Sequence, residues 1–308
     1  MQRTKKTRIN NIFAALDSIP HADAILTGDW HLREDIPICR TDDFESAQWE
    51  KVKWISDLQE RFSCPVFHSG DLFNHWKPSP ALLSKTLKHI PCAFESVYGN
   101  HDLPQHNLEL AYKCGMNVIK TAGLVGMAKD GHWQQPLPEN AGTIYLGKRI
   151  LVWHVMTYEG KPPWPGCTDA PFNAILDKYA NQFDLIVTGH NHKMFYGEKN
   201  GSWLVNPGSL TRQKADQVDH IPTVFLWTAE DNMVYPIEIP HTQNVISREH
   251  IEKVEERDSR IQAFVERLST EFGIGLSFED NLERFEKENQ IRPAVMEIVR
   301  KAIEEEGK

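Results

Sequence analysis

The chain has 308 residues, of which 40% are hydrophobic and 25% are charged, and its formal net charge is −9. This composition indicates a globular protein with one large domain, and its acidic balance argues against a protein that coats nucleic acid nonspecifically. No segment is apolar over the roughly 20 residues that a membrane-spanning helix needs, so we expect no membrane association. The five cysteines form no Cys-x-x-Cys pair, which indicates reduced thiols and a cytoplasmic protein.

Short apolar runs alternate with helical patterns through most of the chain. Residues 1–21 are expected to form a basic arm with a helix from Ile9 to Leu16. We then expect strands at 24–26, 65–67, 94–98, 150–153 and 185–187, and helices at 44–62 and 80–89. A β-hairpin is expected at 221–240. Strands that alternate with helices predict an α/β layered fold.

Two loops and a helical tail complete the organisation. The loop at 122–141 carries Trp133 and His132, which we expect to be an ordinary surface or loop histidine, and the loop at 157–171 is stiffened by prolines. From Ser247 the pattern becomes helical, with further helices expected to begin at Ser277 and Pro293. We therefore divide the chain into an N-terminal arm, a main domain and a helical C-terminal appendage, at 1–21, 22–240 and 241–308.

Five short polar segments carry the chemistry, and each follows an expected strand. They are Asp29-Trp30-His31, Gly70-Asp71, Gly99-Asn100-His101-Asp102, His154 and Gly189-His190-Asn191-His192. In α/β folds, side chains at the carboxyl ends of the strands converge on one site. The sequence therefore predicts one composite site built from all five segments.

The residue types fit hydrolysis of a phosphodiester by two metal ions. Two cations about 3.5–4 Å apart stabilise the entering and leaving oxygens and turn a bridging water into a hydroxide nucleophile. Carboxylates mixed with imidazoles suit Mn²⁺, Fe or Zn²⁺. Asp29 and His31 would share one side of an extended segment, His190 and His192 repeat that spacing, and Asp71 stands alone after a glycine, where it can bridge.

At this point the sequence resembles the calcineurin-like metallophosphoesterase superfamily, and within it the SbcD-type nucleases (the meiotic-recombination-eleven family). Gly70-Asp71-Leu72-Phe73, Val97 to Asp102, and Asn206-Pro207-Gly208-Ser209-Leu210 resemble the family's motifs. The resemblance covers roughly residues 22–240. It implies a layered β-sandwich flanked by helices.

The resemblance also implies a role for each site residue. One metal would be held by Asp29, His31 and His192, the other by Asn100, His154 and His190, with Asp71 as the bridge. His101 would protonate the leaving group, and Asp102 would orient its imidazole. We expect two divalent ions, Mn²⁺ first, with Fe, Zn²⁺ and Mg²⁺ as alternatives.

Substrate contacts are expected from two regions near these motifs. They involve Asn74, His75, Tyr158, Lys161 and Trp164. SbcD-type proteins usually have His or Asp where this chain has Asn74. This difference would change how the chain binds a DNA phosphate. The tail is also shorter than the SbcD capping domain and partner-clasping helices, so the chain acts alone, as a homodimer, or with an ATPase partner of the SbcC type.

Three functions therefore stay open. The first is a DNA nuclease of SbcD type that uses a metal-bridging hydroxide. The second is a phosphodiesterase or phosphatase for small cyclic or dinucleotide substrates, and the third is a non-catalytic interaction module on the same fold. A basic groove around the site would favour DNA, whereas a closed pocket would favour a small molecule.

Overall fold

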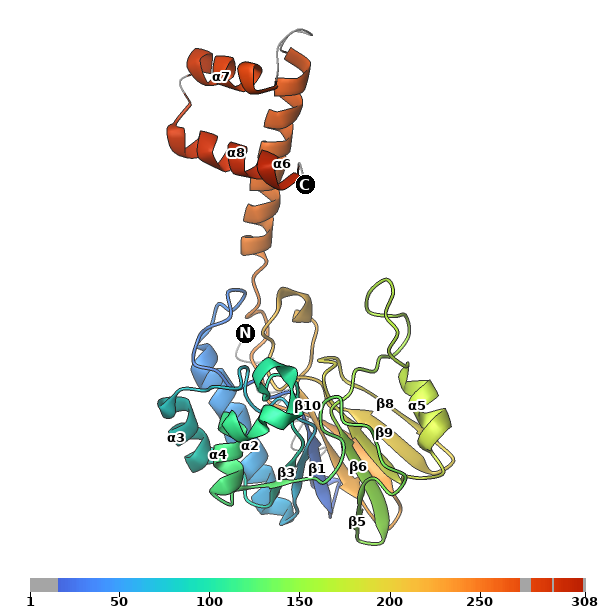
Figure 1. The fold of residues 1–308 in the computed structure, drawn as a ribbon. Helices are drawn as coiled ribbons and strands as arrows, with labels where there is room; N and C mark the ends of the chain where they lie inside the picture. Colours follow the sequence, from blue (N-terminus) through green and yellow to red (C-terminus); the bar gives the residue numbers. More distant parts are fainter. Residues whose placement is uncertain (1–15, 272–277, 290, 307–308) are drawn as a thin grey trace. The chain divides into compact units, whose positions relative to one another are not determined.

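Two β-sheets pack face to face and carry all of the motif segments. The structure is a computed structural model that describes residues 16–271, 278–289 and 291–306 (Figure 1). The chain divides into two units between Ser247 and Arg248, and both sheets belong to the first. The predicted α/β fold, with layered sheets flanked by helices, is confirmed.

The first sheet has six strands in the order β11-β10-β1-β2-β3-β4. Its parallel strands are β1 (Ala24–Thr27), β2 (Val66–His68), β3 (Phe94–Ser96) and β4 (Val125–Met127). The predicted hairpin forms the antiparallel pair β10 (Thr223–Thr228) and β11 (Met233–Glu238). Of these six strands, only β4 has no counterpart among the strands predicted from the sequence.

The second sheet has five strands in the order β5-β6-β7-β9-β8. Its strands are β5 (Thr143–Tyr145), β6 (Lys148–Trp153), β7 (Leu185–Thr188), β8 (Phe195–Lys199) and β9 (Ser202–Asn206). The central strands β6, β7 and β9 are parallel, and the edge strands β5 and β8 are antiparallel to their neighbours. The sequence predicted β6 and β7 but not the other three strands.

Local capping signals fix the two longest helices of this unit. Both α2 (Phe44–Phe62) and α3 (Pro80–His89) have the predicted bounds. The Asp43 carboxylate accepts the Ser46 N–H at 3.0 Å, and Ser79 Oγ accepts the Leu82 N–H at 3.0 Å. The shorter helices are α4 (Gly115–Thr121) and α5 (Phe172–Tyr179), with 3₁₀ turns at Pro104–His106, Leu108–Lys113 and Ala215–Gln217.

Alternating side chains on the strands build three apolar layers. On β1, Ile25 packs in the layer under helices α2, α3 and α4, whereas Ala24 and Leu26 face the second sheet. On β7, Ile186 faces outward and packs with Leu176 of α5. The ribbon shows α2, α3 and α4 on one side of the sheets and α5 on the other (Figure 1). The buried sandwich gives the strand ends a rigid base.

The second unit is helical in its described part. It contains α6 (Glu249–Glu271), α7 (Phe278–Asn289) and α8 (Pro293–Glu306), and Leu282, Met296 and Val299 form its small buried core. The predicted start at Pro293 agrees with α8, but Ser277 and the predicted helix at 9–16, apart from Leu16, lie outside the described residues. Among the described residues, no helix combines the length and apolar character that crossing a membrane requires.

Candidate metal centre

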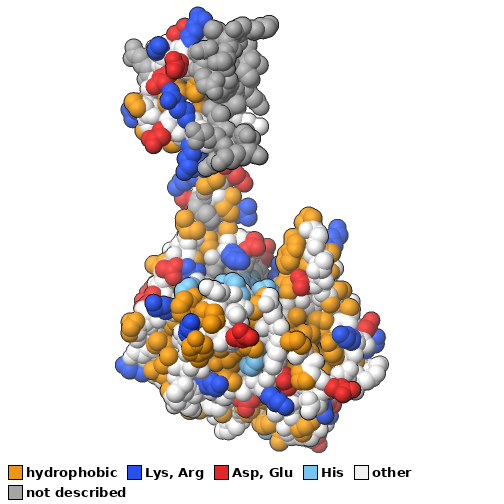
Figure 2. Space-filling view, in the orientation of Figure 1, with side chains coloured by type: hydrophobic (Ala, Val, Ile, Leu, Met, Phe, Trp, Pro, Cys, Tyr) orange, Lys and Arg blue, Asp and Glu red, His pale blue; other side chains and the backbone are white. Residues whose placement is uncertain are grey.

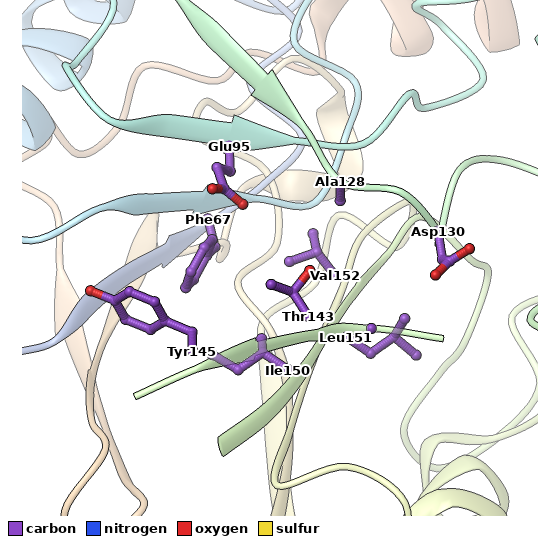
Figure 3. A pocket seen from close by; sticks show the side chains of 10 residues that line it. Phe67, Glu95, Ala128, Asp130, Thr143, Tyr145, Ile150, Leu151 and Val152 are labelled. Carbon is purple, nitrogen blue, oxygen red and sulfur yellow. The ribbon is translucent and has the colours of Figure 1, made fainter. Parts of the chain in front are cut away.

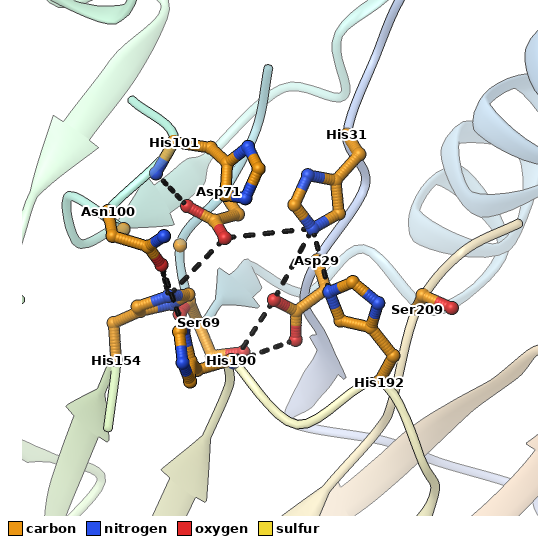
Figure 4. Close-up of polar contacts among 12 residues, drawn as sticks. Asp29, His31, Ser69, Asp71, Asn100, His101, His154, His190, His192 and Ser209 are labelled. Carbon is orange, nitrogen blue, oxygen red and sulfur yellow. Dashed lines mark hydrogen bonds and ion pairs between the residues drawn. The ribbon is translucent and has the colours of Figure 1, made fainter. Parts of the chain in front are cut away.

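The seven predicted ligands gather where strands of both sheets end. Asp29 and His31 follow β1, Asp71 follows β2, and Asn100 follows β3, while the second sheet contributes the remaining three, His154 after β6 and His190 and His192 after β7. Figure 4 shows these side chains pointing toward one another between the strand ends. Parallel strand ends at a common edge explain the convergence of segments that lie up to 163 positions apart in the sequence, from Asp29 to His192.

Asp29, His31 and His192 form one group of donor atoms. Their ligand atoms all lie within 4.8 Å of one another. The Nε2 atoms of His31 and His192 are 3.0 Å apart, and His31 Nε2 lies 3.9 Å from Asp29 Oδ1. Two imidazole nitrogens and a carboxylate that face one point are a donor set for a divalent cation.

A second group contains Asp71, His154 and His190, with their ligand atoms again within 4.8 Å. The side-chain oxygen of Asn100 joins it, 2.8 Å from His190 Nδ1 and 3.1 Å from His154 Nε2. The imidazole of His154 is held from behind, because its Nδ1–H donates to the backbone carbonyl of Ser69 at 2.7 Å. That bond directs the Nε2 atom of His154 into the site.

Asp71 Oδ2 stands between the two groups. It lies 3.6 Å from His31 Nε2 and 3.4 Å from His154 Nε2, and it is buried without a hydrogen-bond partner among the described residues. The other oxygen of Asp71, Oδ1, accepts the backbone N–H of His101 at 2.8 Å. A buried carboxylate oxygen that accepts no hydrogen bond is costly unless a positive charge, from an imidazolium or a metal cation, balances it. The donor set therefore fits a pair of divalent cations that share Asp71.

Burial sets the charge states of the group. It lowers the pKa of His190 to about 4 and of His192 to about 3, and it lowers the pKa of His31 well below its ordinary value. Neutral imidazoles keep the lone pairs that a cation needs. Burial also raises the pKa of Asp29 to about 7. Without positive charge nearby this carboxylate is unfavourable, so a bound cation would stabilise it.

Asp71 and His154 behave as an ion pair. Burial opposes charge on both, but their mutual attraction outweighs it, raising the pKa of His154 to about 9 and lowering the pKa of Asp71. The imidazolium thus supplies the positive charge that the Asp71 carboxylate requires. A cation in the same place would replace this proton.

The backbone around the ligands is left-handed, contrary to the extended segments we expected. Asp29, His31, Asp71 and His190 have φ angles of 48°, 45°, 57° and 76°. Non-glycine residues rarely adopt this region, and such strain gathers at functional sites. Hydrogen bonds between the two ligand loops hold it, from Asp29 N–H to the Gly70 carbonyl (3.0 Å) and from His31 N–H to the Asp71 carbonyl (2.9 Å).

The Asn206–Leu210 turn has a clear structural task. The Asn206 side-chain NH₂ donates to two carbonyls of the loop that carries His190 and His192, at 2.6 and 2.7 Å. The backbone N–H of Ser209 donates to the His192 carbonyl, and that of Leu210 donates to the Asp29 carbonyl, both at 3.1 Å. The turn therefore ties ligand loops from the two sheets to each other.

His101 lies beside the metal ligands with a defined tautomer. Its Nδ1–H donates to the backbone carbonyl of Asn74 at 2.8 Å, and its ring stands edge-on to His31 with centroids 4.7 Å apart. Because Nδ1 is engaged, Nε2 is the nitrogen left to meet a substrate. This placement suits a proton donor to a leaving oxygen.

The expected role of Asp102 is wrong. The carboxylate of Asp102 does not orient His101; it accepts the backbone N–H groups of Asp71, Leu72 and Gly99 through Oδ2 (2.9, 3.3 and 3.1 Å) and that of Phe73 through Oδ1 (3.1 Å). The side chain is fully buried. Asp102 therefore fixes the loop that presents Asp71, and the Asn74 carbonyl takes over the orientation of His101.

The five residues predicted to contact substrate differ in their exposure and in the groups that they contact. Asn74 lies next to His101 but contributes its backbone carbonyl, and His75 is exposed with its ring against Trp76. Tyr158 is only 8% exposed, and its backbone pairs with Pro171 across the base of the loop, so it anchors that loop and offers substrate little surface. Lys161 and Trp164 are exposed on the loop that projects ahead of α5 (Figure 1).

Two functional neighbours were missed in the 122–141 loop. Trp133 stacks on His190 with ring centroids 4.6 Å apart. His132 lies in a loop, as one alternative predicted, but it is buried rather than on the surface: it is 8% exposed, its Nδ1 accepts the Tyr98 N–H at 3.0 Å, and burial lowers its pKa to about 4. Neither contact has a periodic pattern in the sequence, because tertiary contacts bring the loop to the site: Gly131 packs closely against β6, and the backbone N–H of Trp133 donates to the Tyr98 carbonyl at 2.9 Å.

The family comparison matches this geometry. Residues 24–232 match the model of the calcineurin-like phosphoesterase superfamily domain. No curated protein matches the chain.

Solved structures give distant similarities. An archaeal phosphodiesterase is 12% identical, with a TM-score of 0.42 over 70% of this chain and 99% of that one. Vps29 from Entamoeba histolytica in complex with zinc is 14% identical, with a TM-score of 0.35 over 70% and 97%. Vps29 from Cryptosporidium parvum is 18% identical, with a TM-score of 0.35 over 71% and 98%. The family match spans about two thirds of the sequence, and the chain belongs to the calcineurin-like phosphoesterase superfamily.

Proposed function

We propose that this chain is a phosphodiesterase that uses two divalent cations, with Mn²⁺ as the preferred ion, and that it cleaves DNA as a nuclease of SbcD type. The observation that carries the proposal is Asp71 Oδ2, which accepts no hydrogen bond among the described residues and lies between His31 and His154 at 3.6 and 3.4 Å. An oxygen shared by two donor groups is what a bridged pair of cations needs.

The proposed ligands divide into two sets around Asp71. Asp29, His31 and His192 would hold one cation, and Asn100, His154 and His190 the other. When bound, the pair would stabilise charge on the phosphate oxygens and lower the pKa of a water.

The protein's own residues then position the substrate and move a proton. His101 Nε2, fixed by the Asn74 carbonyl, would donate to the departing oxygen, while Asp102 keeps the Asp71 loop in register. Lys161 and Trp164 stand exposed on the projecting loop, where they could meet a phosphate and a base.

The choice of DNA rests on the three local motifs and on this loop. Surface charge favours a second candidate, a small nucleotide. Figure 2 shows Lys and Arg scattered among Asp and Glu on the face in view, with no continuous basic groove beside the histidines gathered there. DNA binding would therefore depend on the cations and on one or a few unstacked nucleotides rather than on a long duplex contact.

The test compares three substrates with one protein. Metal-stripped protein should be inactive and regain activity with Mn²⁺ on bis-p-nitrophenyl phosphate, on single-stranded DNA and, more weakly, on duplex DNA. Activity on bis-p-nitrophenyl phosphate without cleavage of either DNA would reject the nuclease and favour the small nucleotide. No gain with any divalent ion would reject the enzyme altogether.

A further inference from the structure

A cleft opens directly beside the metal centre. It has a volume of about 320 Å³ and runs between the 133–136 segment, the end of β6 and the loop ahead of α5. His154 belongs both to this cleft and to the candidate metal centre. The volume is at the lower end of the roughly 300–1,000 Å³ range typical of small-molecule sites.

A second cavity is too small to bind a substrate. It lies between the sheets, where Phe67 and Glu95 face Tyr145 and Ile150 (Figure 3), and its volume of about 20 Å³ holds no more than a water. Of these two, the larger cleft has room for part of a substrate.

The walls of the cleft suit a flat aromatic group with polar edges. Two tryptophans, Trp133 and Trp153, line it, together with Met156, Gln134 and Asp169. An indole presents a stacking face to any base, and amide and carboxylate groups can meet the hydrogen-bonding edge of a base. None of the lining residues is Lys or Arg, and one is acidic, so the cleft disfavours a second phosphate group.

Trp133 connects the cleft to the ligands. Its ring stacks on His190 with centroids 4.6 Å apart and stands edge-on to His154 at 5.8 Å, so this indole lies against two of the metal ligands at the edge of the cleft. A group in the cleft would therefore be close to a phosphate bound at Asp71. In a nucleotide, a base is linked to its phosphate through a single sugar, which fits this arrangement.

We propose that this cleft binds the nucleobase attached to the scissile phosphate, with Trp153 and Gln134 as specificity-determining residues. The proposal rests on the phosphodiesterase activity proposed above and names its substrate class: a nucleoside phosphodiester, not a sugar or lipid phosphodiester. The base can come from a free nucleotide or from the unstacked end of a DNA strand, since the chemistry that recognises it is the same.

The test compares two esters with one leaving group. The p-nitrophenyl ester of thymidine 5′-phosphate carries a base, and that of the abasic 1,2-dideoxyribose 5-phosphate has the same sugar without a base, so their ratio of kcat/KM isolates the base. Wild-type protein with Mn²⁺ should prefer the thymidine ester by roughly 5- to 150-fold, which corresponds to the 1–3 kcal/mol of one base stack. Trp153→Leu should bring this ratio close to one.

Controls separate a lost contact from a damaged fold. Trp203→Leu is the matched variant, because Trp203 is also a half-buried tryptophan on a strand of the five-stranded sheet but lies outside the cleft; it should keep the wild-type ratio. Gln134→Gly changes the opposite wall, and glycine suits the φ of 56° at this position; it too should lower the ratio. An equal loss on both esters, or no preference in the wild type, would overturn the proposal.

The two proposals fail in different ways. If neither ester is hydrolysed, the phosphodiesterase proposal fails. Binding of thymidine 5′-monophosphate, measured by calorimetry, then tests the base proposal alone. Binding that Trp153→Leu weakens supports the base proposal, and absence of binding overturns it. Where hydrolysis occurs, cleavage of a 3′,5′-cyclic nucleotide is compared with cleavage of a short single-stranded oligonucleotide, which shows whether the base comes from a free nucleotide or from a DNA strand. Trp153→Leu should slow the cleavage of the true substrate more than Trp203→Leu does.

Discussion

Gly99→Ala tests whether the position of Asp71 controls the centre. A Cβ at Gly99 would lie 2.1 Å from Asp71 Oδ1 and 2.4 Å from Asp71 N, where ordinary contact begins at 3.4 Å. The backbone of Gly99 has no positive φ, so alanine adds no conformational strain there. Asp71 would have to retreat by about 1 Å, and overpacking of this kind costs roughly 1–3 kcal/mol.

The displacement should act on metal binding more than on folding. Asp71 Oδ2 would move away from both His31 and His154, so we expect Gly99→Ala to lose at least one of the two cations and about 100-fold in phosphodiester hydrolysis. Metal analysis of the purified protein and bis-p-nitrophenyl phosphate assays in excess Mn²⁺ measure both. The melting temperature should fall by about 2–10 °C.

Gly28→Ala is the matched control. Its Cβ would meet the Ser69 hydroxyl at 1.9 Å, but that hydroxyl can rotate away and has no hydrogen-bond partner to lose among the described residues. We expect Gly28→Ala to keep its metals and most of its activity. If Gly99→Ala also kept both metals and stayed within threefold of wild-type activity, the reasoning about Asp71 would be refuted.

Four further substitutions test other residues. His101→Ala should lose roughly 10²–10⁴-fold in cleavage but keep both metals, whereas His192→Ala should lose metal; an emptied site in His101→Ala would contradict its assignment. Trp164→Ala should weaken the binding of single-stranded DNA more than the hydrolysis of bis-p-nitrophenyl phosphate, and an equal loss of both together with a lower melting temperature would indicate a packing role. Burial lowers the pKa of Lys51 to about 8, whereas an exposed lysine has a pKa of about 10.4. Between these two pH values the unfolded chain binds more protons than the folded one, so the free energy of unfolding rises with pH over that window. Lys51→Met should therefore increase the free energy of unfolding at pH 7 by up to about 3 kcal/mol, and urea denaturation should show this gain shrinking by pH 10; a loss of stability at pH 7 would refute it.

Local signals account for what the sequence predicted well. The bounds of α2 and α3 follow from Asp43 and from the Ser79-Pro80 pair, each of which acts within one helical turn. The strands before the motif segments were recognisable as short apolar runs. Edge strands β5 and β8 were missed because most of their residues are not buried and carry no clear apolar pattern.

Long-range contacts account for what the sequence could not predict. The left-handed backbone at Asp29 and Asp71 depends on hydrogen bonds between loops that are distant in sequence, which override the preference of these residues for extended conformations. Asp102 follows His101 in the chain, but its carboxylate turns toward the N–H groups at 71–73. Trp133 reaches His190 only in the folded protein. Side-chain direction at such positions is set by packing rather than by spacing.

The proposed metal centre depends on Asp71 as the bridge between two cations. The most direct measurement is a crystal structure grown with Mn²⁺, with the ions located by their anomalous scattering. We expect two ions, one contacting His31 and His192, the other contacting His154 and His190, and Asp71 contacting both. A single ion at these residues, or two ions of which Asp71 contacts only one, would contradict it.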